Sequence, residues 1–341
     1  MPVSLLPVSR RGFLAGSMAG AAALLLGRGG LWAAETNLPD PHRVALLSDI
    51  HIATDLKKVE RNVNMAEHLQ SAVGEVAKLL RNAGGPATAF INGDCAHHTG
   101  ELGDYSNVVN LLGPLTDAGL PIHLSMGNHD RRDHLWKTLP WEKWGGGGRV
   151  KAIDSRHVLV VSTPRAEWIV LDSLDKTNQT PGLVGMEQLK WLEGALDAEA
   201  MTKKNVLVMV HHHPQGFQPS EMVSAPASMP ASGTMPGTTQ PAATQPRKIS
   251  GMVDTEALLD LLLPRKQVKA LLFGHTHIWK IKEREGMHLI NLPAVAYPFK
   301  AVEATGWVDC RLGEDGMKLE LRCIDPKHPK HGEVAELKWR G

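Results

Sequence analysis

The sequence is poor in cysteine, in aromatic residues and in net charge. Of its 341 residues, three are cysteines and 5% are aromatic, and the formal net charge is +1. A nearly neutral chain lacks the basic surface that nucleic-acid-binding domains usually present, so we expect no nucleic-acid binding. The hydrophobic fraction of 43% and the charged fraction of 21% are typical of a globular protein with a sizeable core.

The three cysteines do not form an obvious disulfide framework. Cys310 and Cys323 flank a predicted hairpin, but a turn centred on residues 313–316 places Cys310 opposite Leu319. Cys323 is then displaced by about 13 Å along its strand, which exceeds disulfide reach. We therefore expect these two thiols and that of Cys95 to be free and mostly buried.

Long hydrophobic runs are also scarce, and the longest lies near the N-terminus. Ser9-Arg10-Arg11-Gly12-Phe13-Leu14 opens an apolar stretch over residues 13–26, which is shorter than the about 20 residues of a membrane span. This segment resembles a twin-arginine signal peptide, with residues 1–34 as the signal. The resemblance implies a periplasmic or otherwise exported protein that meets the twin-arginine translocase, without stable membrane insertion. An ordinary Sec signal or an uncleaved anchor is the alternative.

After the signal, apolar runs alternate with segments of helical periodicity. Strands are expected at 44–47, 88–91, 122–126, 157–161, 168–171, 206–210 and 268–273, and helices near 65–80, 105–115, 186–196 and 258–263. The strands at 157–161 and 168–171 have no helix between them and should pair antiparallel. This pattern predicts one α/β domain with mixed sheets over residues 42–325, followed by a C-terminal tail at 326–341.

One segment departs from this pattern. Residues 218–247 are rich in Pro, Ser, Thr and Ala and have no aromatic side chain. Such a composition cannot bury enough apolar surface to order itself, which predicts a disordered insertion. Because the segment follows directly after three histidines, a functional lid is the alternative.

Five predicted strands are followed by side chains that can bind metal ions. Their ends read Ser48-Asp49-Ile50-His51, Asn92-Gly93-Asp94, Gly127-Asn128-His129-Asp130, His211-His212-His213-Pro214 and Gly274-His275-Thr276-His277. Binding sites in open α/β sheets form outside the carboxyl ends of the strands, where separate loops converge. Mixed oxygen and nitrogen donors suit Fe, Mn, Zn or Co better than Ca or Mg. The order of the five motifs, more than any one of them, predicts a metal centre.

This ordered set resembles the calcineurin-like metallophosphoesterase superfamily over about residues 43–300. Two further stretches are similar to its cyclic-nucleotide and glycerophosphodiester phosphodiesterase branch: residues 100–105, and Leu171-Asp172-Ser173 followed by residues 188–192. The resemblance implies a four-layer sandwich of two mixed β-sheets flanked by α-helices. It also implies a centre of two divalent or mixed-valence transition-metal ions, whose identity among Fe, Mn, Zn and Co stays open.

The resemblance assigns most of the strand-end residues to the two ions. It implies that one ion is held by Asp49, His51 and His277, that Asp94 bridges, and that the other ion is held by Asn128, His275 and one further histidine.

The further histidine is uncertain from the sequence. Similar sequences place it two residues before a proline, so His212 is predicted to be the ligand; counting from the strand end favours His211 as the alternative. His129 is implied to be the catalytic residue, facing the substrate to stabilise developing charge or to protonate the leaving oxygen.

Together these implications predict an exported hydrolase of small-molecule phosphodiesters. Two ions about 3.5 to 4 Å apart would lower the pKa of a bridging water, and the resulting hydroxide would attack the phosphorus in line. A phosphate-scavenging phosphomonoesterase is the alternative, followed by a catalytically silent binding module. His97 stands where purple acid phosphatases carry a tyrosine ligand, and whether it or His98 touches the substrate stays open.

Overall fold

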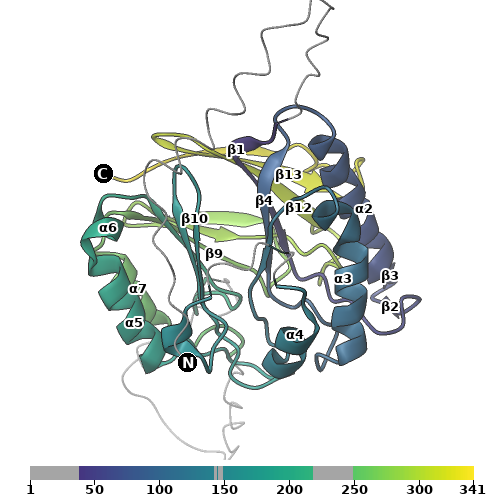
Figure 1. The fold of residues 1–341 in the computed structure, drawn as a ribbon, viewed down its shortest axis with the longest axis horizontal. Coiled ribbons are helices and arrows are strands. Elements are labelled where there is room, and N and C mark those ends of the chain that lie inside the picture. Colours follow the sequence, from purple (N-terminus) through teal and green to yellow (C-terminus); the bar gives the residue numbers. More distant parts are fainter. Residues whose placement is uncertain (1–37, 142–143, 145–148, 218–248) are drawn as a thin grey trace, which may run out of the picture. The chain divides into compact units, whose positions relative to one another are not determined.

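Two six-stranded mixed sheets form the centre of the fold (Figure 1). The computed structural model describes residues 38–141, 144, 149–217 and 249–341. The signal at 1–34 and the insertion at 218–247 therefore lie outside the described residues. The strands of the first sheet, in spatial order, are β14 (Val334–Lys338), β13 (Gly316–Cys323), β12 (Gly306–Leu312), β1 (Asp40–Ser48), β4 (Pro86–Asn92) and β5 (Ile122–Leu124).

The second sheet has the same mixed character. Its strands, in spatial order, are β10 (Lys280–Arg284), β11 (Met287–Asn291), β9 (Val268–Phe273), β8 (Val206–Met209), β7 (Glu167–Val170) and β6 (Leu159–Ser162). Strands β11, β9, β8 and β7 are parallel, and β10 and β6 pair antiparallel at the two edges. The predicted antiparallel pair near 157–171 is confirmed by β6 and β7.

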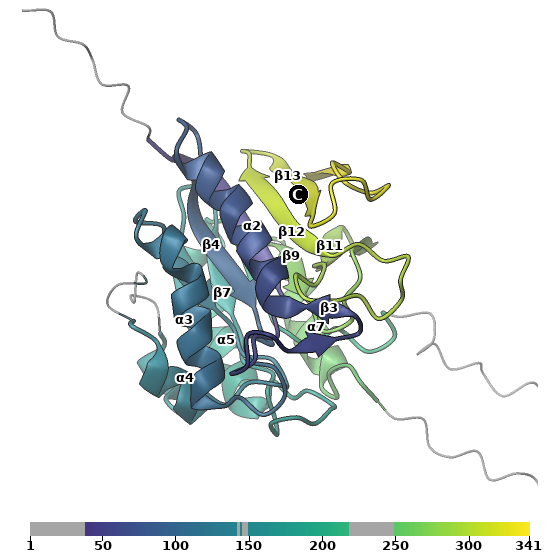
Figure 2. The same ribbon diagram turned by 90° about the vertical axis from the view of Figure 1, so that its right-hand side faces the viewer.

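Helices cover the outer face of each sheet. The helices are α2 (Met65–Leu80), α3 (Leu102–Thr116), α4 (Arg132–Thr138), α5 (Met186–Asp197), α6 (Glu199–Thr202) and α7 (Thr255–Leu262). Helices α2 and α3 lie side by side over the first sheet (Figure 2), and a short hairpin of β2 (Val59–Glu60) and β3 (Val63–Asn64) precedes α2. The side chain of Asn64 caps α2 by accepting hydrogen bonds from the N–H groups of Ala66 and Glu67. No helix in the described ranges is long and apolar enough to span a bilayer.

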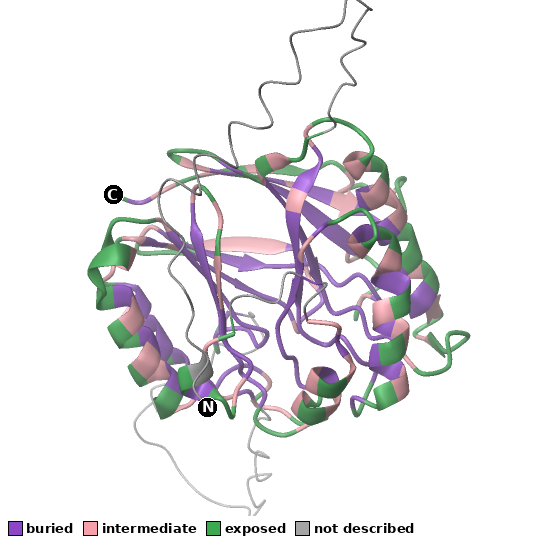
Figure 3. Cartoon of the chain, viewed as in Figure 1, coloured by how far each residue is buried: buried purple, intermediate pink, exposed green. Residues whose placement is uncertain are grey.

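Alternating side chains divide the interior into three cores. In β1, Val44 and Leu46 face the second sheet and pack in the same core as Trp168, whereas Ala45 and Leu47 face α2 and α3. Central strands such as β1, β8 and β9 are therefore buried on both faces over most of their length, as the colouring of Figure 3 shows, which explains their nearly continuous apolar sequences. The other face of the second sheet packs against α5 and α7. The predicted four-layer sandwich is confirmed.

The thiols behave as the sequence predicts. Cys310 pairs with Leu319 across β12 and β13, so the register leaves Cys323 out of reach. All three cysteines are free and buried. Burial raises the pKa of Cys310 well above its ordinary value and that of Cys323 to about 11, which makes both thiols unreactive at neutral pH.

The predicted tail at 326–341 contains a strand of the first sheet. Strand β14 pairs antiparallel with β13, and its alternate residues Ala335 and Leu337, with Trp339 beyond it, pack against the core between the sheets. The side chain of Arg340 is buried and donates to five backbone carbonyls, three of them near the end of α7. The tail interpretation overlooked this short apolar alternation, whose other face is exposed.

Candidate metal centre

The strand-end residues meet where the carboxyl ends of β1, β4, β5, β8 and β9 converge. Hydrogen bonds join the two sheets at this edge: the side chain of Asn92 donates to the carbonyl of Val210 at 3.1 Å. The N–H of His275 likewise donates to the carboxylate of Asp49 at 3.2 Å. Loops that lie up to 226 residues apart in the sequence are thereby fixed against one another.

The first group of possible ligands consists of Asp49, His51 and His277. The Nε2 atoms of the two histidines lie 3.1 Å apart, and Nε2 of His277 lies 3.3 Å from Oδ1 of Asp49. The Nδ1–H of His277 donates to the carbonyl of Tyr297 at 2.5 Å. That contact leaves Nε2 with its lone pair facing the group, which is the arrangement of a metal-binding imidazole.

The second group consists of Asp94, His211 and His275. Nε2 of His211 lies 3.3 Å from Oδ2 of Asp94, and Nε2 of His51, from the first group, lies 3.7 Å from the same oxygen. Asp94 is therefore placed between the two groups, where a bridging carboxylate would be. Asn128 is buried nearby, and its Oδ1 has no hydrogen-bond partner among the described residues.

The geometry favours His211 over His212 as the histidine from the end of β8. The Nδ1–H of His211 donates to the carbonyl of Asn92 at 2.9 Å, so its Nε2 points at Asp94. His212 instead uses Nδ1 in a hydrogen bond with the hydroxyl of Ser173 at 2.8 Å and does not join either group. The assignment of His212 from its distance to Pro214 stays a prediction, because Nε2 of His212 is likewise buried without a hydrogen-bond partner among the described residues.

The residues present fit a pair of metal ions. Buried polar atoms normally have hydrogen-bond partners, yet Nε2 of His211 and Oδ1 of Asn128 have none among the described residues. The facing Nε2 atoms of His51 and His277 belong to the same water-poor region. Cations would satisfy these lone pairs at once, and the mixed nitrogen and oxygen donors match transition metals.

The backbone is strained where these side chains leave the strands. Nine non-glycine residues in the described part of the chain have positive φ, and five of them belong to the two groups, with φ between 46° and 68°: Asp49, His51, Asp94, His275 and His277. Each such residue costs about 1 to 3 kcal/mol and persists only where the surroundings enforce it. Strain concentrated on possible ligands is a mark of a functional site.

Two glycines in the motifs allow the close approach of the carboxylates. A Cβ on Gly127 would collide with the carboxylate of Asp94, and a Cβ on Gly274 would collide with Ser48 and the carboxylate of Asp49. The glycines in the strand-end motifs are therefore required by the space that the two carboxylates occupy.

The two carboxylates make the centre attractive to cations. Burial raises the pKa of Asp49, but His277 and His211 outweigh this effect and lower it to about 2. Burial lowers the pKa of His211, but Asp94 and Asp49 outweigh it and raise that pKa to about 10. The negative charge of Asp94 and Asp49 that favours a proton on His211 would also favour a metal ion there, and metal binding would displace the proton.

Asp130 clamps two of the loops and is a structural residue that the motif alone does not reveal. Its buried carboxylate accepts hydrogen bonds from the N–H groups of Cys95, Ala96 and Gly127 and from the hydroxyl of Tyr105. Burial raises its pKa to about 6 despite these donors. The carboxylate of Asp130 thus holds the loop after β4 and the loop after β5 in a fixed position relative to each other.

His129 is placed beside the two groups with a defined ring orientation. Its backbone N–H donates to Oδ1 of Asp94 at 2.8 Å, and its Nδ1 lies 3.1 Å from the carbonyl of His98. A carbonyl only accepts, so Nδ1 carries the proton and Nε2 is the atom left for chemistry. The ring centroid lies 5.2 Å from that of His51, and His129 also groups with His51 and Asp94.

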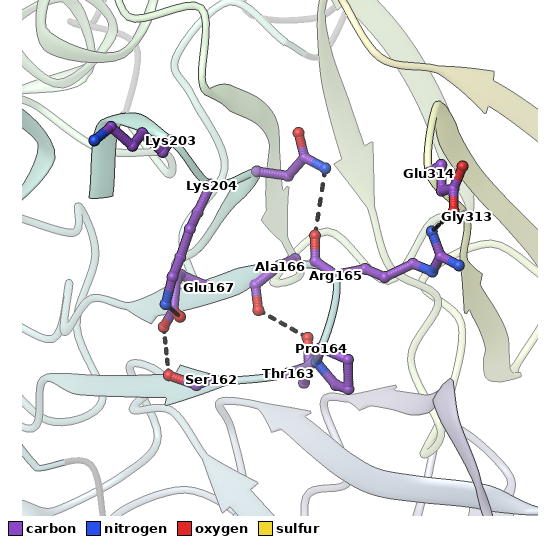
Figure 4. Close-up of a pocket in the computed structure, with 11 residues that line it drawn as sticks. Ser162, Thr163, Pro164, Arg165, Ala166, Glu167, Lys203, Lys204, Gly313 and Glu314 are labelled. Atoms are coloured by element: carbon purple, nitrogen blue, oxygen red, sulfur yellow. Dashed lines mark hydrogen bonds and ion pairs between the residues drawn. The ribbon is translucent and has the colours of Figure 1, made fainter. Parts of the chain in front are cut away.

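The pocket in Figure 4 lies away from these groups, at the amino ends of β7 and β8. It has a volume of about 410 Å³ and is lined by the β6–β7 turn, by residues 203–205 and by the β12–β13 turn. Its charged side chains already have partners: Lys204 pairs with Glu167, Arg165 with Glu314 at 3.1 Å, and Lys203 with Glu199 at 3.0 Å. None of these lining residues belongs to a metal-binding group.

Comparisons with known proteins place the chain in a family. The family model for calcineurin-like phosphoesterases matches residues 42–279. A probable cyclic nucleotide phosphodiesterase of Rhodopseudomonas palustris is 30% identical over 175 residues, covering 50% of this chain and 57% of that protein. The 3′,5′-cyclic adenosine monophosphate phosphodiesterase CpdA of Pseudomonas aeruginosa is 24% identical over 257 residues, covering 74% and 76%.

The fold also matches solved structures. A dimetal phosphatase from Danio rerio superimposes with a TM-score of 0.59 at 16% identity, covering 88% of this chain and 100% of that one. At this identity the match concerns the fold alone.

We predict that His211→Ala lowers the metal content of the purified protein by one ion per chain, because it removes a nitrogen that faces Asp94. His212→Ala, the matched control, should retain both ions. Asp94→Asn should reduce both, since its carboxylate lies between the two groups. Elemental analysis measures each content. Loss of an ion from His212→Ala but not from His211→Ala would reverse the assignment.

Proposed function

Because the chain belongs to the calcineurin-like phosphoesterase family, we propose that it hydrolyses phosphodiesters, with cyclic nucleotides as the favoured substrates. The observation that carries hydrolysis is the convergence of Asp49, Asp94 and the surrounding histidines at one strained, buried edge. When bound, a pair of divalent ions supplies positive charge to the phosphoryl oxygens and lowers the pKa of water. The relatives named as cyclic nucleotide phosphodiesterases support the substrate class.

The chain's own contribution to the chemistry is centred on His129. With Nδ1–H held by the carbonyl of His98, His129 acts as a general acid in its imidazolium form: Nε2 then carries a second proton, which passes to the leaving oxygen as the ester bond breaks and leaves a neutral imidazole. The backbone N–H of the same residue donates to Asp94, so the proton donor and the carboxylate that would bridge the two ions are held next to each other.

An aromatic side chain beside the centre supports a nucleotide over a simple phosphate. Phe299 is 47% exposed, and its ring stacks on that of His277 with centroids 4.1 Å apart. The guanidinium of Arg61 lies 5.0 Å from the centroid of Phe299. An exposed ring beside a cation offers a stacking surface for a base and a positive charge for a phosphate.

The alternative within the same chemistry is a phosphomonoesterase. A silent binding module is disfavoured because each of the five strand-end motifs carries at least one side chain that can bind a metal or act on the substrate. To decide, the metal-loaded protein should be assayed on cyclic nucleotides, on bis-nitrophenyl phosphate and on phosphomonoesters.

We expect cyclic nucleotides to be hydrolysed with the highest kcat/KM. Phe299→Ala should raise KM for cyclic nucleotides roughly 10-fold, the loss of about one stacking contact, and should change KM for bis-nitrophenyl phosphate little. Val302→Ala, at another exposed apolar position, is the control. A clear preference for monoesters would favour the phosphatase alternative.

We predict that His129→Ala keeps both ions and lowers kcat by roughly 10² to 10⁴, the range for a positioned acid or base. The loss should be larger on alkyl phosphodiesters than on bis-nitrophenyl phosphate, because an alkoxide needs a proton and a nitrophenolate leaves largely unaided. His134→Ala, in α4, is the matched control. Equal losses on both substrates would limit His129 to electrostatic stabilisation, and loss of an ion would make it a ligand.

We also propose that the chain is exported through the twin-arginine pathway, on the basis of Arg10 and Arg11 and the apolar stretch that follows them. Replacing both arginines with lysine should retain the protein in the cytoplasm, as measured by cell fractionation. Arg28→Lys, in the same segment, should leave export unchanged. Undiminished export of the double variant would exclude this route.

A further inference from the structure

A separate group of metal-binding side chains lies next to the candidate metal centre. It consists of Glu60 at the end of β2 and the consecutive residues His97 and His98 in the loop after β4. None of the three belongs to the two groups around Asp49 and Asp94.

The geometry of the group is compact. One possible ligand atom from each residue lies within 4.8 Å of the other two. Nε2 of His97 lies 3.7 Å from Oε2 of Glu60, and the centroids of the two histidine rings are 3.8 Å apart. The carboxylate and both imidazoles are thus close enough to share one ion after small side-chain rotations.

His97 supplies the independent sign of a ligand. Its side chain is 9% exposed, and its Nε2 is buried without a hydrogen-bond partner among the described residues, although it faces Glu60. Burial, followed by the neighbouring His98, lowers the pKa of His97 to about 4. The ring is therefore neutral at pH 7, which is the form that binds metal ions, and a charged pair with Glu60 does not account for the arrangement.

The fold holds the two elements rigidly. The residues just before His97 donate their N–H groups to the buried Asp130, so the histidine loop is anchored at its start. Glu60 is presented by the β2–β3 hairpin, whose turn residues Arg61 and Asn62 both have positive φ, as a tight two-residue turn requires. The group is therefore largely preformed.

We propose that Glu60, His97 and His98 bind a third divalent cation, for which Zn²⁺ is the best match. Two imidazole nitrogens and one carboxylate oxygen form a zinc donor set that leaves a fourth position open to water or to a substrate oxygen. The site adjoins His129, because the His98 carbonyl accepts from that ring and the two ring centroids are 5.6 Å apart. An ion there adds positive charge beside the proposed proton donor.

The test is the zinc content of the purified full-length protein, with zinc titrated by isothermal calorimetry and bound zinc counted by elemental analysis. The wild type should bind three ions. Glu60→Gln and His97→Asn should each keep two and weaken the third by at least roughly 10- to 100-fold, the loss that follows even from changes outside the ligand shell. Glu67→Gln, at an exposed position in the first turn of α2, should bind three.

Asp94→Asn separates this site from the central pair. It should lose the central ions and keep one, and Co²⁺ in that variant should give a visible absorption band that Glu60→Gln abolishes. A wild type that stops at two ions, or a Glu60→Gln variant that still binds three, overturns the proposal. Loss of all ions from His97→Asn overturns it as well. No assay of phosphodiester hydrolysis enters this test, so its outcome is independent of the proposed function.

Discussion

Two buried carboxylates impose the constraint on which this structure depends. Asp49 and Asp94 are at most 2% exposed, and ionised groups removed from water need compensating positive charge or hydrogen bonds. Hydrogen bonds from the Ser48 hydroxyl to Asp49 and from the His129 N–H to Asp94 supply part of this compensation. The rest comes from histidines whose second nitrogens are fixed by backbone carbonyls. Burial of the two negative charges is unfavourable without a cation, so the same arrangement attracts cations strongly.

The sandwich makes that arrangement possible. Strained residues such as Asp49 and His277 persist because the segments before them are strands buried on both faces. The paired sheets bring their carboxyl ends to one edge, and Asn92 fastens one sheet to the other there. The cores therefore provide the rigidity, and the strand-end loops provide the donors.

The sequence predicted the parts of this structure that rely on local pattern. Buried strands can be recognised as apolar runs in the sequence. Strand β10 reads Lys-Ile-Lys-Glu-Arg and has too few apolar residues to be recognised in this way. The sequence could not decide between His211 and His212, because the direction of the ring depends on a long-range hydrogen bond. Nδ1 of His211 bonds the carbonyl of Asn92, which lies 119 residues away in the sequence. The grouping of Glu60 with His97 has the same long-range origin and no sequence signal of its own.

His129 connects the central groups to the Glu60, His97 and His98 cluster. Its backbone binds Asp94 and its ring binds the carbonyl of His98, so a displacement of either loop moves the same imidazole. Asp130, the next residue, anchors both loops at once. The sequence Gly127-Asn128-His129-Asp130 therefore combines a close approach, an oxygen donor, a proton donor and a clamp in four consecutive positions. A substitution that loosens the Asp130 clamp would disturb metal binding and proton transfer together.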